Sequence, residues 1–249
     1  MGQKKLIRFE AIKSFPNVLQ YPEGMPGKWA AFFKNENPLT LELACGKGEY
    51  TVSLARMHPD RNFIGIDLKG NRIYIGAKKC LEDKIGNAAF LRSHIDKILN
   101  YFAPGEVKEI WLTFPDPQLR LSRIRKRLTH PEFLRLYGQI LVPGGRIRLK
   151  TDSPALYSFT KSVIGLYGLE LLEDSQDVQT AIDTPASAGL ENLPEEVIRE
   201  LAIKTHYQGL DIAKSNRIYY CCFSLPANAL PPIDDILHER CKQLELQTT

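Results

Sequence analysis

The stretch "TFPDPQLRLSRIRKRL", residues 113–128, places one carboxylate next to a group of cations. Asp116 stands between two prolines directly after an apolar run, and the prolines restrict the backbone, so we expect a rigidly held carboxylate. Five cations follow: Arg120, Arg123, Arg125, Lys126 and Arg127. We expect these cations to bind RNA phosphates, with Arg123, Arg125, Lys126 and Arg127 on the RNA backbone. The structural alternative is a capping aspartate beside a solvated basic face.

A second stretch, "LELACGKGEY" at residues 41–50, has the form E-x-x-x-G-x-G at an expected strand-to-helix turn. Gly46 and Gly48 would let a ligand approach the backbone and the free N–H groups of the helix start. The turn lacks the third glycine of dinucleotide sites, which disfavours an oxidoreductase, and it lacks the G-K-[ST] of a P-loop. Taken alone, the turn fits a packing role as well.

Acidic residues favour the ligand. Asp67 ends the next expected strand, about 20 residues after the turn, where a carboxylate binds ribose hydroxyls. Glu42 lies on the first strand and suits a cationic amino group. A ribose, an ammonium and no pyrophosphate describe S-adenosylmethionine. His94 and Asp96 follow the third strand, where the adenine edge is expected, and either one fits equally well as a neighbour of a helix N-terminus.

Alternating strands and helices must position these residues. Strands are predicted at residues 39–44, 62–68, 88–93, 107–114 and 144–151, and helices at 50–58, 71–86, 95–102, 130–141 and 153–168. This alternation predicts an α/β fold with a mostly parallel sheet and helices on both faces. Residues 216–225 form a late strand that is expected to lie antiparallel at the sheet edge.

The chain is expected to divide into three parts. Residues 1–38 form a basic, aromatic N-terminal extension, residues 39–225 the main domain, and residues 226–249 a tail with a short helix. Within the main domain, the polar residues 175–195 have no clear period and are interpreted as a loop or insertion.

Composition narrows the functional classes. The chain of 249 residues is 43% apolar and 25% charged, and its net charge of +4 is too small for a whole-chain argument about polyanions. Its five cysteines contain no C-x-x-C pair, so neither a zinc site nor a disulfide framework is expected. No apolar run suits a membrane span, and the N-terminus lacks the apolar region of a secretory signal. We therefore expect a cytoplasmic protein with no membrane partner and no metal. Monomer and homodimer both fit.

Six ordered segments resemble the bacterial tRNA (guanine-N7)-methyltransferases, and the resemblance covers residues 38–225. The segments are "LELACGKGEY", "FIGIDLKGNRI", "TFPDP", "KRLTHPEFL", "LVPGGRIRLKTDSPALY" and "KTHYQGLDIAKSNRIYY". The resemblance implies a class I methyltransferase fold, Rossmann-like and seven-stranded, with S-adenosyl-L-methionine as methyl donor. It also implies tRNA as partner and N7-methylation of a variable-loop guanine, usually position 46.

The resemblance also implies roles for single residues. Asp116 matches the residue that the family treats as catalytic, and it would line the donor site with Glu42, Asp67 and the His94/Asp96 region. Substrate binding would fall to Arg120, which stands where lysine is usual, to Asp152 of "KTD", and to the signature segment Thr205, His206, Tyr207 and Gln208.

Three departures from the family pattern bear on the substrate. Gln118 replaces a tryptophan, "RLSR" replaces a lysine-rich segment, and Gln208 replaces the signature glutamate. Two alternatives therefore remain open: a class I methyltransferase with a different substrate, and a non-catalytic RNA-binding relative. The survival of Glu42, Asp67 and Asp116 favours the enzyme.

Overall fold

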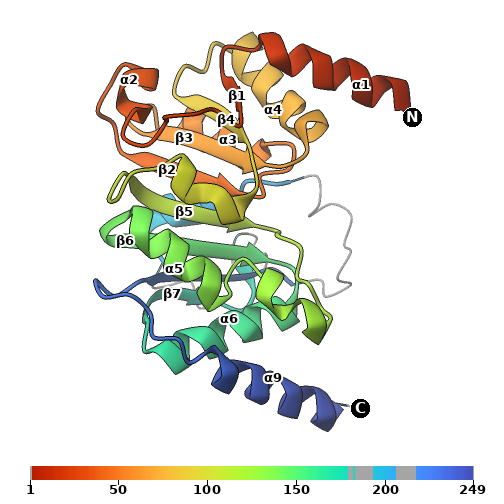
Figure 1. Cartoon of the computed structure of the whole chain (residues 1–249), viewed down its shortest axis with the longest axis vertical. Helices are drawn as coiled ribbons and strands as arrows, with labels where there is room; N and C mark the ends of the chain where they lie inside the picture. Colours follow the sequence, from red (N-terminus) through yellow and green to blue (C-terminus); the bar gives the residue numbers. More distant parts are fainter. Residues whose placement is uncertain (1, 179–181, 183–192, 206–216, 249) are drawn as a thin grey trace.

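The computed structural model describes residues 2–178, 182, 193–205 and 217–248. Its strands form one sheet in the order β1-β4-β3-β2-β5-β6-β8-β7 (Figure 1). The strands are β1 (Val18–Gln20), β2 (Leu39–Leu43), β3 (Asn62–Asp67), β4 (Ala88–Arg92), β5 (Val107–Thr113), β6 (Leu141–Thr151), β7 (Glu170–Ser175) and β8 (Tyr219–Ser224). The predicted α/β fold with a mostly parallel sheet is confirmed.

Helices follow most of the strands. The α-helices are α1 (Gly2–Ala11), α2 (Trp29–Phe33), α3 (Glu49–Met57), α4 (Gly70–Glu82), α5 (Pro131–Ile140), α6 (Pro154–Tyr167), α8 (Glu195–Leu201) and α9 (Asp234–Thr248). Three short 3₁₀ segments are η1 (Ile12–Ser14), η2 (Ile95–Asn100) and η3 (Leu121–Lys126). No described helix is both long and apolar enough to cross a membrane.

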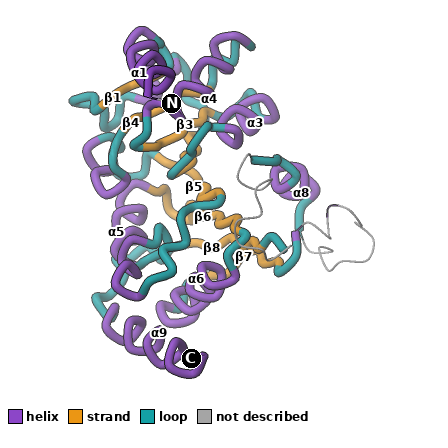
Figure 2. The backbone as a smooth tube through the Cα atoms, turned by 90° about the vertical axis from the view of Figure 1, so that its right-hand side faces the viewer, coloured by secondary structure: helices purple, strands orange, loops and turns teal. Residues whose placement is uncertain are grey.

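Two apolar cores lie on the two faces of the sheet, because successive side chains of a strand point to opposite faces. Leu41 and Leu43 of β2 pack with α5, α6 and α9 in one core. Phe90 of β4 and Trp111 of β5 pack with α3, α4 and α8 in the other. Figure 2 shows the strands between α5 on one side and α3 and α8 on the other. Burial on both faces explains the nearly continuous apolar runs of the central strands.

The antiparallel strand predicted near the end of the chain is β8, which pairs with β6. Its other neighbour is β7, so β8 lies one strand inside the edge. Strand β7 reads "ELLEDS", whose acidic residues hide its strand character in the sequence.

The N-terminal extension is part of the same body. Strand β1 pairs with β4 and adds an eighth strand to the seven that the family resemblance implies. Helix α1 packs on α4, where Arg8 lies over the ring of Tyr74 and the guanidinium of Arg92 lies over Phe9. The boundary expected at residue 38 therefore separates segments that share one sheet.

Candidate active site

A cavity of about 700 Å³ lies at the carboxyl ends of the central strands, where parallel α/β sheets bind ligands. It collects side chains from turns that follow β2, β3, β5 and β6. The residues predicted from the sequence that line it are Glu42, Gly46, Asp67, Asp116, Asp152 and Thr205. Residues spread over more than 160 positions of the chain thus meet in one cavity.

Gly48 does not line this cavity but packs the glycine turn against the sheet. Both turn glycines have positive φ, 57° at Gly46 and 72° at Gly48, so an L side chain would strain the turn. A Cβ on Gly48 would lie 2.4 Å from Cε1 of Phe90, and one on Gly76 of α4 would lie 2.7 Å from the carbonyl oxygen of Lys47. Gly48 is therefore needed for close packing of the turn on Phe90, and it does not line the cavity.

Asp67 holds the glycine turn in place. Its Oδ2 accepts a hydrogen bond of 3.0 Å from the backbone N–H of Gly46, and its Oδ1 accepts one of 2.8 Å from the N–H of Lys69. The side chain is only 8% exposed. Asp67 therefore organises the backbone of the cavity, in addition to lining it.

Glu42 forms the floor of the cavity. Its Oε2 accepts from the N–H and hydroxyl of Thr51 in α3, and its Oε1 accepts from the hydroxyl of Thr113 at 2.6 Å. The residue is 4% exposed. Burial raises the pKa of Glu42 to about 7, although the hydrogen bonds from Thr113 and Thr51 lower it. This carboxyl group therefore holds its proton more tightly than a carboxyl group in water does.

Asp116 is presented in the opposite way, exposed on a strained loop. Phe114 and Gln118 on either side of it have positive φ values of 47° and 46°, which non-glycine residues rarely adopt. The N–H of Gln118 donates to Oδ1 of Asp116 at 3.0 Å. Backbone strain of this kind concentrates at functional sites. The loop therefore aims an accessible carboxylate into the cavity.

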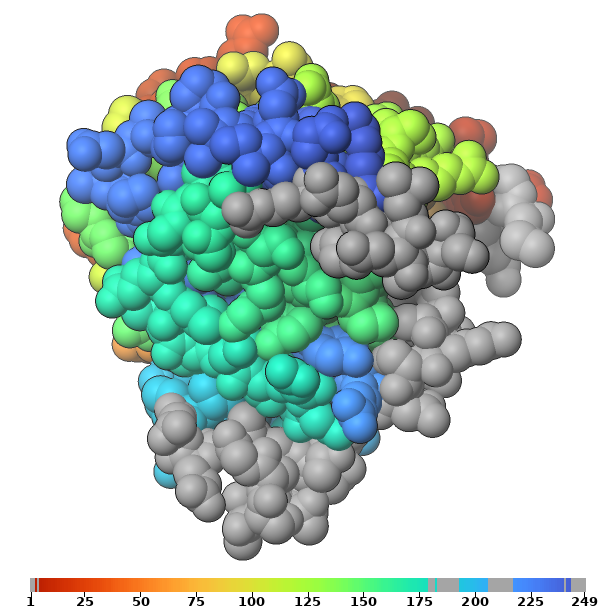
Figure 3. All heavy atoms as spheres, turned by 90° about the horizontal axis from the view of Figure 1, so that it is seen from below, coloured from red at the N-terminus to blue at the C-terminus, as the bar shows by residue number. Residues whose placement is uncertain are grey.

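The basic run divides into two groups. Arg120, Arg123, Arg125 and Lys126 are exposed on or beside η3. Figure 3 shows helix α9 (blue) over α6, with the yellow-green residues near 125 beside it. An ion pair of 3.5 Å joins Arg125 to Glu132, and the Arg125 side chain is 61% exposed. These four cations suit phosphates that approach from solvent.

Arg127 differs from the other cations of the basic run, although the sequence analysis expected it to bind the RNA backbone with them. It is only 6% exposed, its Nε donates to the carbonyl oxygens of Pro117 and Gln118, and its guanidinium lies over the ring of Phe159. This buried guanidinium holds the loop after Asp116 and is not presented to solvent, from which an RNA backbone would approach. The spacing of the residues could not predict the burial of Arg127, because the sequence does not show which cations of a basic run point into the protein.

His94 and Asp96 do not line the cavity. Both are exposed, and His94 precedes η2 as its N-cap residue without a side-chain capping bond. The expected contact with an adenine edge therefore lacks support from the arrangement of these two residues. His206, Tyr207 and Gln208 lie outside the described residues.

Several lining residues were missed in the sequence. Lys69 and Arg72 line the cavity from the start of α4, and Phe114 and Ser153 line it next to predicted acids. The signal was their position: each follows the carboxyl end of a parallel strand within a few residues. Leu119, at 62% exposure, adds an apolar side chain to the rim.

Two comparisons bear on the family. A family model described as "Putative methyltransferase" matches residues 36–196. The tRNA (guanine-N(7)-)-methyltransferase of Porphyromonas gingivalis is 43% identical over 86% of this chain and 86% of its own. That of Bacteroides thetaiotaomicron is 38% identical over the full length of both chains. This chain belongs to the tRNA (guanine-N7)-methyltransferase family.

Solved structures support the fold of this tRNA (guanine-N7)-methyltransferase family member. The 16S rRNA methyltransferase KamB has a TM-score of 0.58 at 15% identity and covers 84% of this chain and 99% of its own. A 16S rRNA (adenine(1408)-N(1))-methyltransferase variant from Catenulisporales acidiphilia, solved with its cosubstrate SAM, has a TM-score of 0.53 at 17% identity, covering 84% of this chain and 93% of its own. At these identities the likeness concerns the fold alone, and it confirms the class I methyltransferase architecture.

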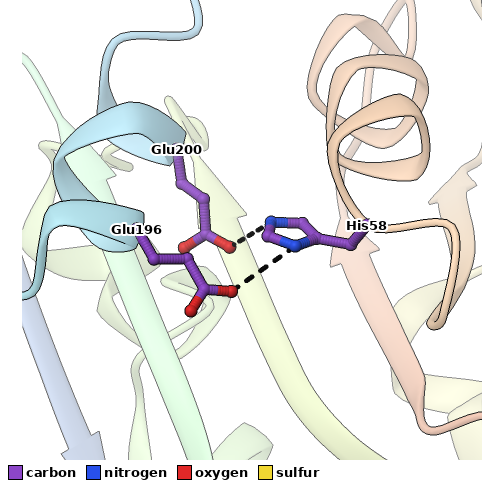
Figure 4. Close-up of side chains that lie close together, drawn as sticks. All are labelled: His58, Glu196 and Glu200. Carbon is purple, nitrogen blue, oxygen red and sulfur yellow. Dashed lines mark ion pairs between the residues drawn. The ribbon is translucent and has the colours of Figure 1, made fainter.

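A second polar cluster of this family member lies outside the cavity, between α8 and the end of α3 (Figure 4). Nε2 of His58 lies 2.8 Å from Oε1 of Glu200, and Nδ1 lies 3.4 Å from Oε1 of Glu196. The two carboxylates thus approach opposite nitrogens of the ring, whereas one metal ion binds one ring nitrogen. The guanidinium of Arg61 also lies 2.7 Å from the same oxygen of Glu196. The contacts of the His58 ring and the ion pair between Arg61 and Glu196 therefore anchor α8.

Proposed function

We propose that this protein transfers a methyl group from S-adenosyl-L-methionine to N7 of the guanine at position 46 in the variable loop of tRNA. One observation carries the proposal: a single cavity joins the Asp67-bound glycine turn to Asp116, and four exposed cations begin directly beyond it. The similar tRNA (guanine-N(7)-)-methyltransferases support the same class of RNA and the same atom of guanine.

The residues of the cavity suit the methyl donor. S-adenosyl-L-methionine, when bound, supplies an electrophilic methyl group on a cationic sulfonium. Glu42 and Asp67 place two carboxyl groups in the lining of the cavity, which favours a cationic ligand over a pyrophosphate. Asp67 and the N–H groups of the glycine turn would hold the ribose and the amino-acid part. We assign donor binding to Glu42, Gly46 and Asp67.

The chemistry asks for positioning more than for a base. N7 of guanine carries a lone pair and no proton, so its attack forms the N–C bond while the C–S bond breaks and leaves its electron pair on sulfur. No proton moves, and positive charge develops on the base. Asp116 would accept hydrogen bonds from guanine N–H groups and offset this charge. Asp152 and Thr205, which also line the cavity, would hold the guanine.

The exposed cations would hold the RNA. Arg120, Arg123, Arg125 and Lys126 lie where the chain leaves the cavity after Asp116. A tRNA whose variable loop enters the cavity would lay its phosphates on this surface, and phosphate contacts fix position without reading sequence.

Transfer of labelled methyl groups to unmodified tRNA tests the proposal. We expect label at one variable-loop guanine, detected by chain cleavage at N7-methylguanine, and none in a tRNA whose guanine 46 is replaced by adenine. Label on another RNA or on protein would instead indicate a class I methyltransferase with a different substrate. Donor binding without transfer to any RNA would also contradict the proposal.

A further inference from the structure

Lys150 is a buried cation on the sheet face that carries α3 and α8. Its side chain belongs to β6 and is 1% exposed. Its Nζ donates hydrogen bonds to the carbonyl oxygens of Leu201 at 2.7 Å and Ile203 at 3.0 Å. The last carbonyl groups of a helix lack partners within the helix, and a cation there is favourable. Lys150, on strand β6, thus caps the C-terminus of α8.

Two aromatic rings also lie close to this ammonium. Nζ lies 5.2 Å from the ring centroid of Tyr50 and 5.3 Å from that of Phe114, distances suited to cation–π attraction. The hydroxyl of Tyr50 also donates to the carbonyl oxygen of Glu200 at 2.9 Å. Tyr50 and Lys150 therefore hold the end of α8 together.

The same lysine is connected to the cavity on both sides. The N–H of Phe114 donates to the carbonyl oxygen of Lys150 at 2.8 Å, and Phe114 lines the cavity. Thr205, another lining residue, follows Ile203 by two positions. In the sheet, Lys150 pairs with Thr113, whose hydroxyl binds Glu42. Lys150 thus stands between the floor of the cavity and the chain that leads to Thr205.

We propose that Lys150 is a positioning residue for methyl transfer: its ammonium holds the chain from the end of α8 to Thr205 against Phe114, and so shapes the wall that receives the guanine. The inference rests on the proposed function, which assigns this wall to the acceptor. Burial lowers the pKa of Lys150 to about 7, so keeping a cation here is costly. An apolar side chain would avoid that cost but would leave the carbonyl groups of Leu201 and Ile203 without their donor.

Lys150→Met tests the proposal, because methionine keeps the apolar stem and removes the donors. We expect kcat/KM for tRNA to fall by about 10- to 100-fold, since small misplacements of a reacting group have effects of this size. The Kd for S-adenosyl-L-methionine, measured by calorimetry, should change by less than about twofold, because the Asp67 side of the cavity is untouched. Amide hydrogen exchange at residues 202 and 203 should become faster.

Three further variants keep the test decisive. Lys150→Arg should restore most of the activity, because it keeps the charge and the donors. Tyr50→Phe keeps the ring and should shift the tRNA parameters in the same direction by a smaller factor, which covers a Lys150→Met protein that fails to fold. Val163→Ala, in the core on the opposite face of the sheet, is the control for lost stability alone. It should leave kcat/KM for tRNA and Kd for S-adenosyl-L-methionine unchanged.

Two results would overturn the proposal. One is an equal loss of donor affinity and of tRNA efficiency in Lys150→Met, which would indicate general damage. The other is faster exchange at residues 202 and 203 with unchanged tRNA kinetics. A wild-type protein without activity on tRNA would overturn the proposed function instead, and the exchange comparison would still show whether Lys150 holds this segment.

Discussion

The two sides of the cavity hold their carboxylates in opposite ways. Asp67 and Glu42 are buried, and each accepts hydrogen bonds from the protein on both oxygens. Asp116 is exposed, and the described residues give it one hydrogen bond, from the N–H of Gln118. The buried side is complete before any ligand arrives, as suits a small donor of constant shape. The exposed side leaves Asp116 accessible to hydrogen bonds that a bound RNA would supply.

The comparison gives its largest expected effect at Asp116. In Asp116→Asn the charge is lost while the loop geometry is kept, so kcat for tRNA should fall by about 100-fold or more. Donor Kd should change far less, because the buried carboxylates are intact. Single-turnover methyl transfer and calorimetry measure the two quantities. A matched control is Asp235→Asn, an exposed carboxylate in α9.

The pH dependence of the rate sharpens the same prediction. If Asp116 orients the base and offsets charge without taking a proton, the rate should not follow a titration through neutral pH in a Glu42→Gln, Lys150→Arg background, which lacks two groups near the cavity whose pKa values lie near 7. A steep rise of the rate through neutral pH that persists in that background would contradict this role, since it would mean proton abstraction.

Asp67→Asn should give the complementary result on the buried side. An amide nitrogen cannot accept from a backbone N–H, so either Gly46 or Lys69 loses its partner. Hydrogen bonds to charged groups contribute about 1.5–3 kcal/mol, so donor Kd should rise by about 10- to 100-fold. At saturating donor, kcat should stay near the wild-type value. Equilibrium binding of S-adenosyl-L-methionine measures this Kd, with Asp60→Asn at an exposed residue as control. Equal donor affinity in Asp67→Asn and Asp60→Asn would contradict the assignment of donor binding to the buried side.

The basic run offers a smaller effect with an internal contrast. Changing Arg123, Arg125 and Lys126 together to glutamine should lower the slope of log Kd for tRNA against log salt by about 2–3, and weaken binding at low salt by about 10-fold. Arg127→Gln should leave the slope unchanged and lower kcat, because the buried guanidinium holds the loop after Asp116. Lys108→Gln, in the strand leading to the cavity, is the control for net charge. Equal slopes for Arg127 and the exposed set would contradict the division.

Much of the buried side was predictable from the sequence. Carboxyl ends of neighbouring parallel strands meet at one edge, so residues that end "LELA" and "FIGID" had to come together once the alternation of strands and helices was recognised. Gly48 was predicted to serve the ligand, and its packing on Phe90 could not be foreseen because it depends on a ring two strands away.

The exposed side was less predictable, for a physical reason. Whether Arg127 or Lys126 points into the protein depends on the turn that η3 makes, and five closely spaced cations carry no signal for that. Lys150 reads as an exposed strand residue until α8 covers it. Strand β1 has only three residues and strand β7 is acidic, so neither has the apolar alternation on which strand prediction depends.

The smallest expected effect concerns stability. It tests how much the buried carboxyl group of Glu42 destabilises the folded protein when it is ionised. Burial raises the pKa of Glu42 to about 7, so the folded protein holds this proton more tightly than the unfolded chain. The stability contributed by the protonated group is therefore complete below pH 4.5 and is lost as the pH rises through about 7. Glu42→Gln removes the titration and can still bond Thr51 and Thr113, because the hydroxyl of Thr113 can accept from the amide.

Urea unfolding of the ligand-free protein at pH 5 and pH 8 measures this difference. Glu42→Gln and wild type should be nearly equal at pH 5, and the variant should be more stable at pH 8 by on the order of 1 kcal/mol, since one pKa unit corresponds to about 1.36 kcal/mol and the raised pKa already includes the effect of the threonine bonds. The exposed control Glu82→Gln in α4 should show no such change with pH. The result would differ if the difference in unfolding free energy between Glu42→Gln and wild type were the same at both pH values. Ionised Glu42 would then not destabilise the folded protein, and the two sides of the cavity would differ only in the exposure of their carboxylates.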